Sequence, residues 1–155
     1  MKFFLLVVTL CFAVSFSAGA QYRFSSTKDI ECTEVKSQGS TGTCWSYATS
    51  SFLESELMRT DKGDMDISEM YVVREIYKDK ARNYVLRQGK ANFSQGSLSH
   101  DVIRVLRTKG MMPQSAFQGK ADTEKKYNHT EMEAVLKGML DGVIKQKKVS
   151  DKWMI

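Results

Sequence analysis

The chain has 155 residues, of which 26% are charged, and its 23 basic and 18 acidic residues give a net charge of +5 at pH 7. Because the charges are interspersed and form no basic arm or stripe, we expect no nucleic-acid partner. The sequence contains no CxxC pair, no HExxH motif and no cluster of histidines, so we expect no metal site and no cofactor.

The first twenty residues have the pattern of a signal peptide. Lys2 is followed by the apolar run FFLLVVTLCFAVSF, and Ser17–Ala20 provides a cleavage site of small residues. The run is shorter than the roughly 18 to 20 apolar residues that span a membrane, and Cys11 lacks the small residue that precedes a lipoprotein anchor. We therefore expect export, by secretion or to a periplasm, with cleavage after Ala20 and no stable membrane anchor. The mature chain, residues 21–155, is large enough for one hydrophobic core.

The stretch KSQGSTGTCWSYA places a cysteine at the predicted start of a helix. A thiol is a nucleophile only as the thiolate, which the partial positive charge of a helix N-terminus favours. Gly39 and Gly42 allow a sharp turn and the close approach of a substrate. The amide of Gln38 and the backbone N–H of Cys44 could together form an oxyanion hole for a carbonyl under attack. A phosphate-binding loop would need a lysine that is missing here.

Apolar residues at helical spacing predict four helices after the signal peptide and no strand of any length. The first begins near Cys44 and the second follows a cap at Ser68. The third runs from about Ser99 to Lys109 and stops at Gly110, and the last opens with a capping box at Thr130–Glu133. The residues expected to face the core are Trp45, Ala48, Phe52, Leu53, Leu57, Tyr71, Val72, Ile76, Tyr77, Ala81, Tyr84, Val85, Val102, Ile103, Val105, Leu106, Met132, Val135, Leu136, Met139, Leu140, Val143 and Ile144.

The segment QGSTGTCWSYA resembles the nucleophile segment of papain-like cysteine peptidases, whose usual form at the cysteine is C-G-[SA]-C-[WY]. The resemblance implies that Cys44 is the nucleophile, that Gln38 belongs to the oxyanion hole and that Trp45 is the usual aromatic neighbour. Further along, Ile67–Tyr71 is similar to the LSE-x-Y helix start of the family.

Gly96 and Ser97 are similar to the family segment whose backbone pairs with substrate on the non-primed side, and they are the predicted substrate-binding residues. Thr41 replaces a disulfide cysteine of many secreted relatives, and no long inhibitory propeptide precedes Gln38. These features, with the stretches ISEMYVVREIYKDKARNY and QGKANF…GSLSHD, resemble the bleomycin hydrolase and aminopeptidase C branch. The resemblance covers roughly residues 28–120.

A papain-like peptidase has an α+β fold, of which residues 21–155 would form the mainly helical, nucleophile-bearing N-terminal half. The resemblance implies a peptide substrate, an acyl-thioenzyme intermediate and an aminopeptidase mode of cleavage. Enzymes of this branch often form ring-like hexamers, so a homo-hexamer is an expected state of the full-length enzyme.

The resemblance places the general-base histidine roughly 130 to 150 residues after the cysteine, with an asparagine beyond it. Only 111 residues follow Cys44, and the apolar ending Trp153–Ile155 indicates a segment heading into a core. We therefore expect residues 21–155 to be the truncated front part of a domain, with little or no peptidase activity by itself. Of the two histidines, His100 lies at a predicted loop-to-helix junction and is a weak candidate base, whereas His129 is expected in a solvated loop.

Two other interpretations stay open at this point. One is a non-catalytic interaction or inhibitory module that keeps the helical half of the fold. The other is a small structural domain held together by a Cys32–Cys44 disulfide, because an exported protein with two cysteines invites such a bond. We predict instead that Cys44 is a free thiol and that Cys32 is not its partner.

Overall fold

The structure is a computed structural model that describes residues 22–121, 123–146 and 148–154. The predicted signal peptide, residues 1–20, lies outside this part of the chain. The described residues form four α-helices and one short 3₁₀ helix: α2 (Cys44–Arg59), α3 (Glu69–Leu86), α4 (Ser99–Lys109), α5 (Thr130–Ile144) and η1 (Asp151–Met154). Pairing between extended segments is limited here to two isolated bridges, Ser40 with Asn128 and Ile67 with Pro113. The described chain is therefore mainly helical, as predicted.

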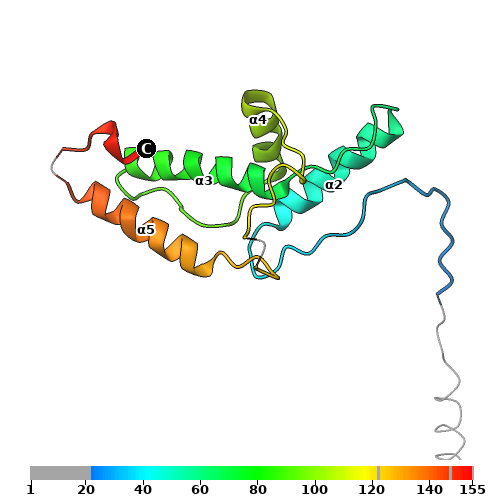
Figure 1. The fold of residues 1–155 in the computed structure, drawn as a ribbon, viewed down its shortest axis with the longest axis horizontal. Coiled ribbons are helices and arrows are strands. Elements are labelled where there is room, and N and C mark those ends of the chain that lie inside the picture. Colours follow the sequence, from blue (N-terminus) through cyan, green and yellow to red (C-terminus); the bar gives the residue numbers. More distant parts are fainter. Residues whose placement is uncertain (1–21, 122, 147, 155) are drawn as a thin grey trace, which may run out of the picture.

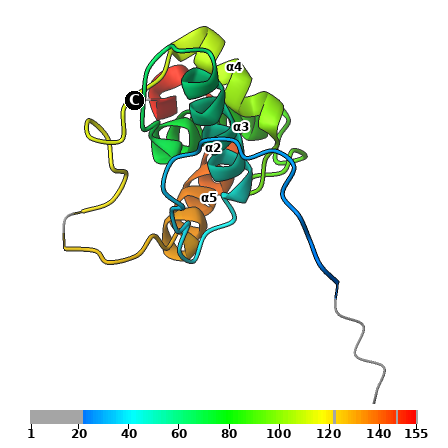
Figure 2. The ribbon, with the colours of Figure 1, turned by 90° about the vertical axis from the view of Figure 1, so that its right-hand side faces the viewer.

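Helix α3 is the centre of the arrangement and contacts α2, α4 and α5, while α2 also contacts α4. In Figure 1, α2 and α3 extend in opposite directions from a common region, and α5 lies alongside α3. Between α4 and α5, residues 114–121 and 123–127 extend away from the helices in Figure 2. This segment returns to the start of α2, where the N–H of Ser40 donates to the carbonyl of Tyr127 at 2.8 Å. No helix among the described residues is long and apolar enough to cross a membrane.

The helix ends predicted from the sequence agree with the structure for the first three helices. Ser68 caps α3, because its side-chain oxygen accepts a hydrogen bond from the N–H of Tyr71 at 3.1 Å. Gly110 ends α4 at a φ of 83°, a left-handed conformation that favours glycine. The core lies where α2, α3 and α4 meet and along the face of α3 toward α5; it comprises Trp45, Met70, Val72, Val73, Ile76, Tyr77, Tyr84, Val85, Phe93, Val102, Val105 and Leu140.

The buried face of α2 differs from the prediction. Phe52 is 62% exposed and Ala48 is also exposed, whereas the helix buries Trp45 together with polar residues (Ser46, Thr49, Ser50 and Glu54). Most of these polar groups find partners: the hydroxyl of Ser46 donates to the carbonyl of Glu69, and that of Thr49 donates to the carbonyl of Trp45. Buried polar side chains are tolerated in a protein interior when they are hydrogen-bonded. The start of α3 therefore packs against the face of α2 that carries these polar residues, and not against the face that carries Phe52.

Helix α5 also departs from the prediction at its start and on its inner face. Thr130 is the first helical residue, so the capping box does not form, and the N–H of Thr130 instead donates to the side chain of Asn128 at 3.1 Å. Leu140 is buried, but Met132, Val135 and Met139 are 39%, 56% and 63% exposed. Met132 and Met139 line an open groove of about 730 Å³ between α5 and α3, so these side chains face solvent rather than a packed core.

His129 is buried, which corrects its expected place in a solvated loop. It is 8% exposed, precedes α5 and packs edge-on against the ring of Tyr77 with 6.2 Å between centroids. Its Nδ1 has no hydrogen-bond partner among the described residues. Burial lowers the pKa of His129, and the nearby carboxylate of Glu133 opposes this only in part.

We expect His129 to make the fold less stable in mild acid. Its pKa is lower in the folded chain than the usual 6.5, so the unfolded chain takes up a proton first as the pH falls below that value, and stability is lost through this window. In His129→Phe, which keeps the aromatic contact, the urea midpoint should depend less on pH between 7.5 and 5. His100→Gln is the control, because His100 is exposed. The expectation is wrong if His129→Phe keeps the pH dependence of the wild type.

Candidate active site

Cys44 is the first residue of α2 and is exposed to solvent as a free thiol. The carbonyl of Thr43 accepts the N–H groups of Ser46 at 2.9 Å and Tyr47 at 3.4 Å, which begins the helix. The N–H of a first helical residue has no acceptor within its own helix. The Cys44 thiol and its N–H group therefore both lie at the positive end of the α2 dipole.

The turn that precedes Cys44 is closed by its own side chains. The amide nitrogen of Gln38 donates to the carbonyl of Thr41 at 2.7 Å, and the hydroxyl of Thr41 donates back to the carbonyl of Gln38 at 2.9 Å. The hydroxyls of Thr41 and Thr43 share a further hydrogen bond of 2.5 Å. An amide NH₂ group has two hydrogens, so Gln38 keeps one for a ligand. The role of Gln38 in an oxyanion hole stays a prediction. The hydrogen bonds by which Thr41 closes the turn were not predicted from the sequence.

Gly39 is required by the close approach of a second segment to this turn. Its φ is +63°, and a Cβ added to it would lie 2.5 Å from the carbonyl oxygen and 2.9 Å from the nitrogen of Tyr127. The adjacent Ser40 N–H binds that same oxygen. The glycine thus allows the turn to attach to the segment before α5.

Replacing Gly39 with alanine is expected to destabilise the fold more than the same change at Gly63. Both glycines have positive φ, where a Cβ costs roughly 1–2 kcal/mol, but a Cβ at Gly63 meets nothing within 4 Å. Gly39→Ala adds a steric clash with Tyr127, so its urea-derived loss of unfolding free energy should exceed that of Gly63→Ala. Equal losses in the two variants would show that Tyr127 does not restrain the turn.

The predicted substrate-binding residues are held beside the nucleophile by Gln95. Its side-chain oxygen accepts the N–H of Gly42 at 2.7 Å, and its carbonyl accepts the indole N–H of Trp45 at 3.0 Å. These bonds bring Gly96, the next residue, to the start of α2. A Cβ on Gly96 would meet nothing within 4 Å, so this backbone is open to a ligand. The structure therefore brings Gln38, Cys44 and the Gly96–Ser97 segment together, through a residue that the sequence did not single out.

The family model described as papain family cysteine protease matches residues 20–148, which is most of the chain. The chain belongs to this family. No curated protein matches it significantly. Papain-family membership supports a cysteine peptidase-like nature, and the matched region includes Gln38, Cys44 and Gly96.

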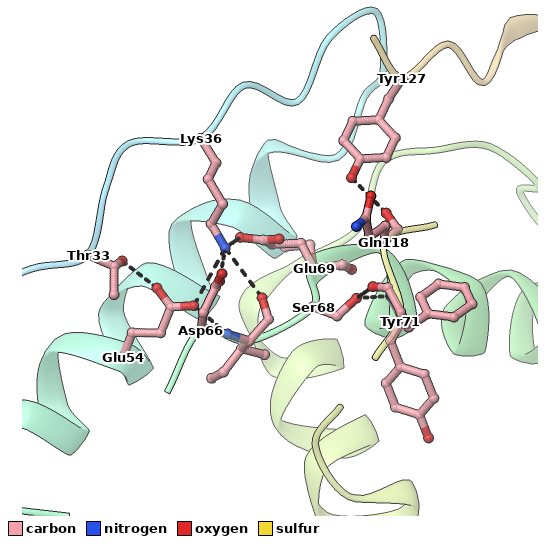
Figure 3. A network of polar contacts seen from close by, with 12 residues as sticks. Thr33, Lys36, Glu54, Asp66, Ser68, Glu69, Tyr71, Gln118 and Tyr127 are labelled. Carbon is pink, nitrogen blue, oxygen red and sulfur yellow. Dashed lines mark hydrogen bonds and ion pairs between the residues drawn. The ribbon is translucent and has the colours of Figure 1, made fainter. Parts of the chain in front are cut away.

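In this papain-family chain, the segment that leads into the turn carries Lys36 at the centre of a network of charges, shown in Figure 3, in which two of the carboxylates are buried. The ammonium of Lys36 lies 2.6 Å from a carboxylate oxygen of Glu69, 2.6 Å from one of Asp66 and 3.7 Å from one of Glu54. The side chains of Glu54 and Glu69 are 1% and 3% exposed. The Glu54 carboxylate also accepts the N–H of Ile67 at 2.8 Å. This network joins the segment before the turn, α2 and the start of α3.

The single ammonium of Lys36 thus lies close to three carboxylates, and this arrangement shifts the pKa values of Lys36 and Glu69. Burial raises the pKa of Glu69, although its hydrogen bond to Lys36 opposes the change. Burial would lower the pKa of Lys36, but hydrogen bonds to Asp66 and Glu69 outweigh it and raise that pKa. Lys36 therefore stays charged at neutral pH.

Neither described histidine forms a hydrogen bond with Cys44. His129 packs on Tyr77 of α3, and the side chain of His100, 68% exposed, lies 3.4 Å from the carboxylate of Asp101. The two cysteines of the described chain, Cys32 and Cys44, are both free and exposed, so the structure gives no support to a domain held by their disulfide. Among the described residues, no three His, Cys, Asp or Glu side chains gather as metal ligands.

Proposed function

We propose that this protein is an exported cysteine peptidase, an aminopeptidase of the bleomycin hydrolase type, that uses Cys44 as its nucleophile. The observation that carries the proposal is the junction at Gln95: an exposed thiol at a helix N-terminus lies beside an open glycine backbone. A thiol in a papain-family chain with these neighbours can attack a peptide that is laid against Gly96 and Ser97.

The reaction follows from these positions. The Cys44 thiolate attacks the scissile carbonyl, and a carbon–sulfur bond forms while the carbonyl oxygen becomes an oxyanion. The free hydrogen of the Gln38 amide and the N–H of Cys44 are the donors available to that oxyanion. The carbon–nitrogen bond then breaks, the amine leaves with a proton, and water hydrolyses the thioester to an acid and the free thiol. A general acid–base group must take up and return these protons.

The proposal is tested with the protein as its gene encodes it, in reducing buffer, on two matched fluorogenic substrates. One is an aminoacyl amide with a free amine, and the other is the same compound with an acetylated amine. An aminopeptidase should hydrolyse the free compound and leave the acetylated one nearly intact. Equal rates would contradict the aminopeptidase mode, and no hydrolysis of either compound or of longer peptides would contradict peptidase activity and favour a non-catalytic module.

A further inference from the structure

Lys80, on α3, makes two charge-assisted hydrogen bonds to the segment that lies beside Cys44. Its half-buried ammonium donates to the carbonyl of Ser94 at 2.7 Å and to the carbonyl of Gly96. Hydrogen bonds of this kind, with one charged partner, are roughly twice as strong as neutral ones. Burial lowers the pKa of Lys80, and the carboxylates of Asp101 and Glu133 partly offset that effect. The ammonium thus loses hydration at this position and has two backbone oxygens in its place.

The two carbonyls that Lys80 holds belong to the residues on either side of Gln95. Gln95 in turn holds Gly42 and Trp45, which lie on either side of Cys44. The contacts are direct at each step, and they run from α3 through Gln95 to the start of α2. A change in the position of Gln95 would therefore move both flanks of the nucleophile.

Among the described residues, the other hydrogen bonds of the turn lie within it or at its far end. The hydroxyl of Thr41 bonds locally, to the carbonyl of Gln38 and to the hydroxyl of Thr43. Gly39 and Ser40 attach the other end of the turn to Tyr127. Gln95 is thus the contact that fixes the end of the turn nearest to Cys44.

We propose that Lys80 and Gln95 are positioning residues for Cys44: Lys80 fixes the backbone on both sides of Gln95, and Gln95 fixes the backbone on both sides of the nucleophile. This inference rests on the proposed peptidase function and adds two residues that act on its nucleophile from outside the reacting groups. It predicts that loss of either side chain impairs the reaction of Cys44 with a peptide more than its reaction with a small reagent, because only the peptide must be aligned with the thiol.

The test measures labelling of Cys44 by a dipeptidyl chloromethyl ketone and by iodoacetamide, with Cys32 as the internal reference. In Lys80→Met and Gln95→Leu, peptidyl labelling of Cys44 should fall roughly ten- to a hundredfold, the cost of a misplacement of about 1 Å. Labelling of both cysteines by iodoacetamide should stay within about twofold of the wild type. Lys80→Arg keeps the charged donor and Gln95→Glu keeps the acceptor, so both should restore most of the peptidyl rate.

A second readout follows the Trp45 indole directly. The chain has two tryptophans, and the Trp45 N–H binds the carbonyl of Gln95. In ¹⁵N-labelled protein the Trp45 indole proton should exchange faster with solvent in Lys80→Met than in the wild type, while that of Trp153 stays unchanged. Should Lys80→Met not fold, Gln95→Leu against Gln95→Glu decides the question.

The outcomes separate this inference from the proposed function. If the peptidyl reagent does not prefer Cys44 to Cys32 in the wild type, the peptidase itself is contradicted. If that preference exists but persists in Lys80→Met and Gln95→Leu, only the positioning role is overturned. A loss in Lys80→Arg as large as in Lys80→Met overturns it equally.

Discussion

In the protein as its gene encodes it, rather than in residues 21–155 by themselves, replacing Cys44 with alanine is expected to abolish peptide hydrolysis and leave the fold intact. Removal of a peptidase nucleophile costs on the order of 10⁶-fold in turnover, because no other group can form the covalent intermediate. The thiol is exposed at the first position of α2 and is absent from the core, so the thermal midpoint should change little.

The chain supplies its own control for this result, since Cys32 is a second exposed free thiol. Cys32→Ala should hydrolyse peptides at the rate of the wild type. If turnover survives in Cys44→Ala, or is lost in Cys32→Ala, then Cys44 is not the nucleophile.

Replacing Lys36 with methionine is expected to have the largest effect on stability, a loss of about 3–5 kcal/mol of unfolding free energy. The change removes the cation that faces the buried carboxylates of Glu54 and Glu69 and keeps a side chain of similar length. Without this cation the two buried carboxylates keep, among the described residues, only neutral hydrogen-bond donors, such as the N–H of Ile67 on Glu54, to replace their lost hydration. Urea unfolding at pH 7 measures the loss.

Arg59→Met is the matched control for the Lys36 experiment. Arg59 also has a close carboxylate, that of Glu56 at 2.6 Å, but both side chains are exposed. An exposed pair of this kind contributes between about 0 and 1 kcal/mol. Equal losses in Lys36→Met and Arg59→Met would mean that the Lys36 network does not support the fold.

Local sequence patterns predicted the helices well where one short signal decides the structure. Ser68 caps the start of α3 through its side-chain oxygen, and Gly110 ends α4 through its positive φ, both as predicted. Thr130 was misplaced by one position, because the helix begins one residue earlier: the N–H of Glu133, which a capping Thr130 would bind, donates to the carbonyl of His129, and Asn128 accepts the N–H of Thr130.

Side-chain burial was harder to predict because it depends on segments that are distant in the sequence. The apolar stripe of α2 predicted a buried Phe52, yet the side that packs carries Glu54, whose partners come from residues 33, 36 and 67. The burial of His129 likewise depends on its contact with Tyr77, which lies more than fifty residues earlier in the sequence.

In the candidate site, too, some residues could be predicted from short motifs and others could not. Gln38, Cys44, Gly96 and Ser97 were named from short motifs, and the structure brings them together. The residues that link them were not singled out: Gln95 was not named, and Lys80 was only part of the stretch ISEMYVVREIYKDKARNY. Their hydrogen bonds join positions 14 to 53 residues apart. A signal was nonetheless present: Gln95 precedes the glycine of the predicted substrate segment, where a side-chain amide can reach a neighbouring turn.

The most direct test of the central claim, that Cys44 is the nucleophile of a cysteine peptidase, is to trap the acyl-thioenzyme. The protein is mixed with an amino-acid p-nitrophenyl ester, quenched in acid within its first turnovers, and digested for mass spectrometry. We predict one acyl group on the peptide that contains Cys44, a much smaller amount on Cys32, and no such adduct at position 44 in Cys44→Ala. Equal acylation of the two thiols, or acylation of neither, would contradict the assignment.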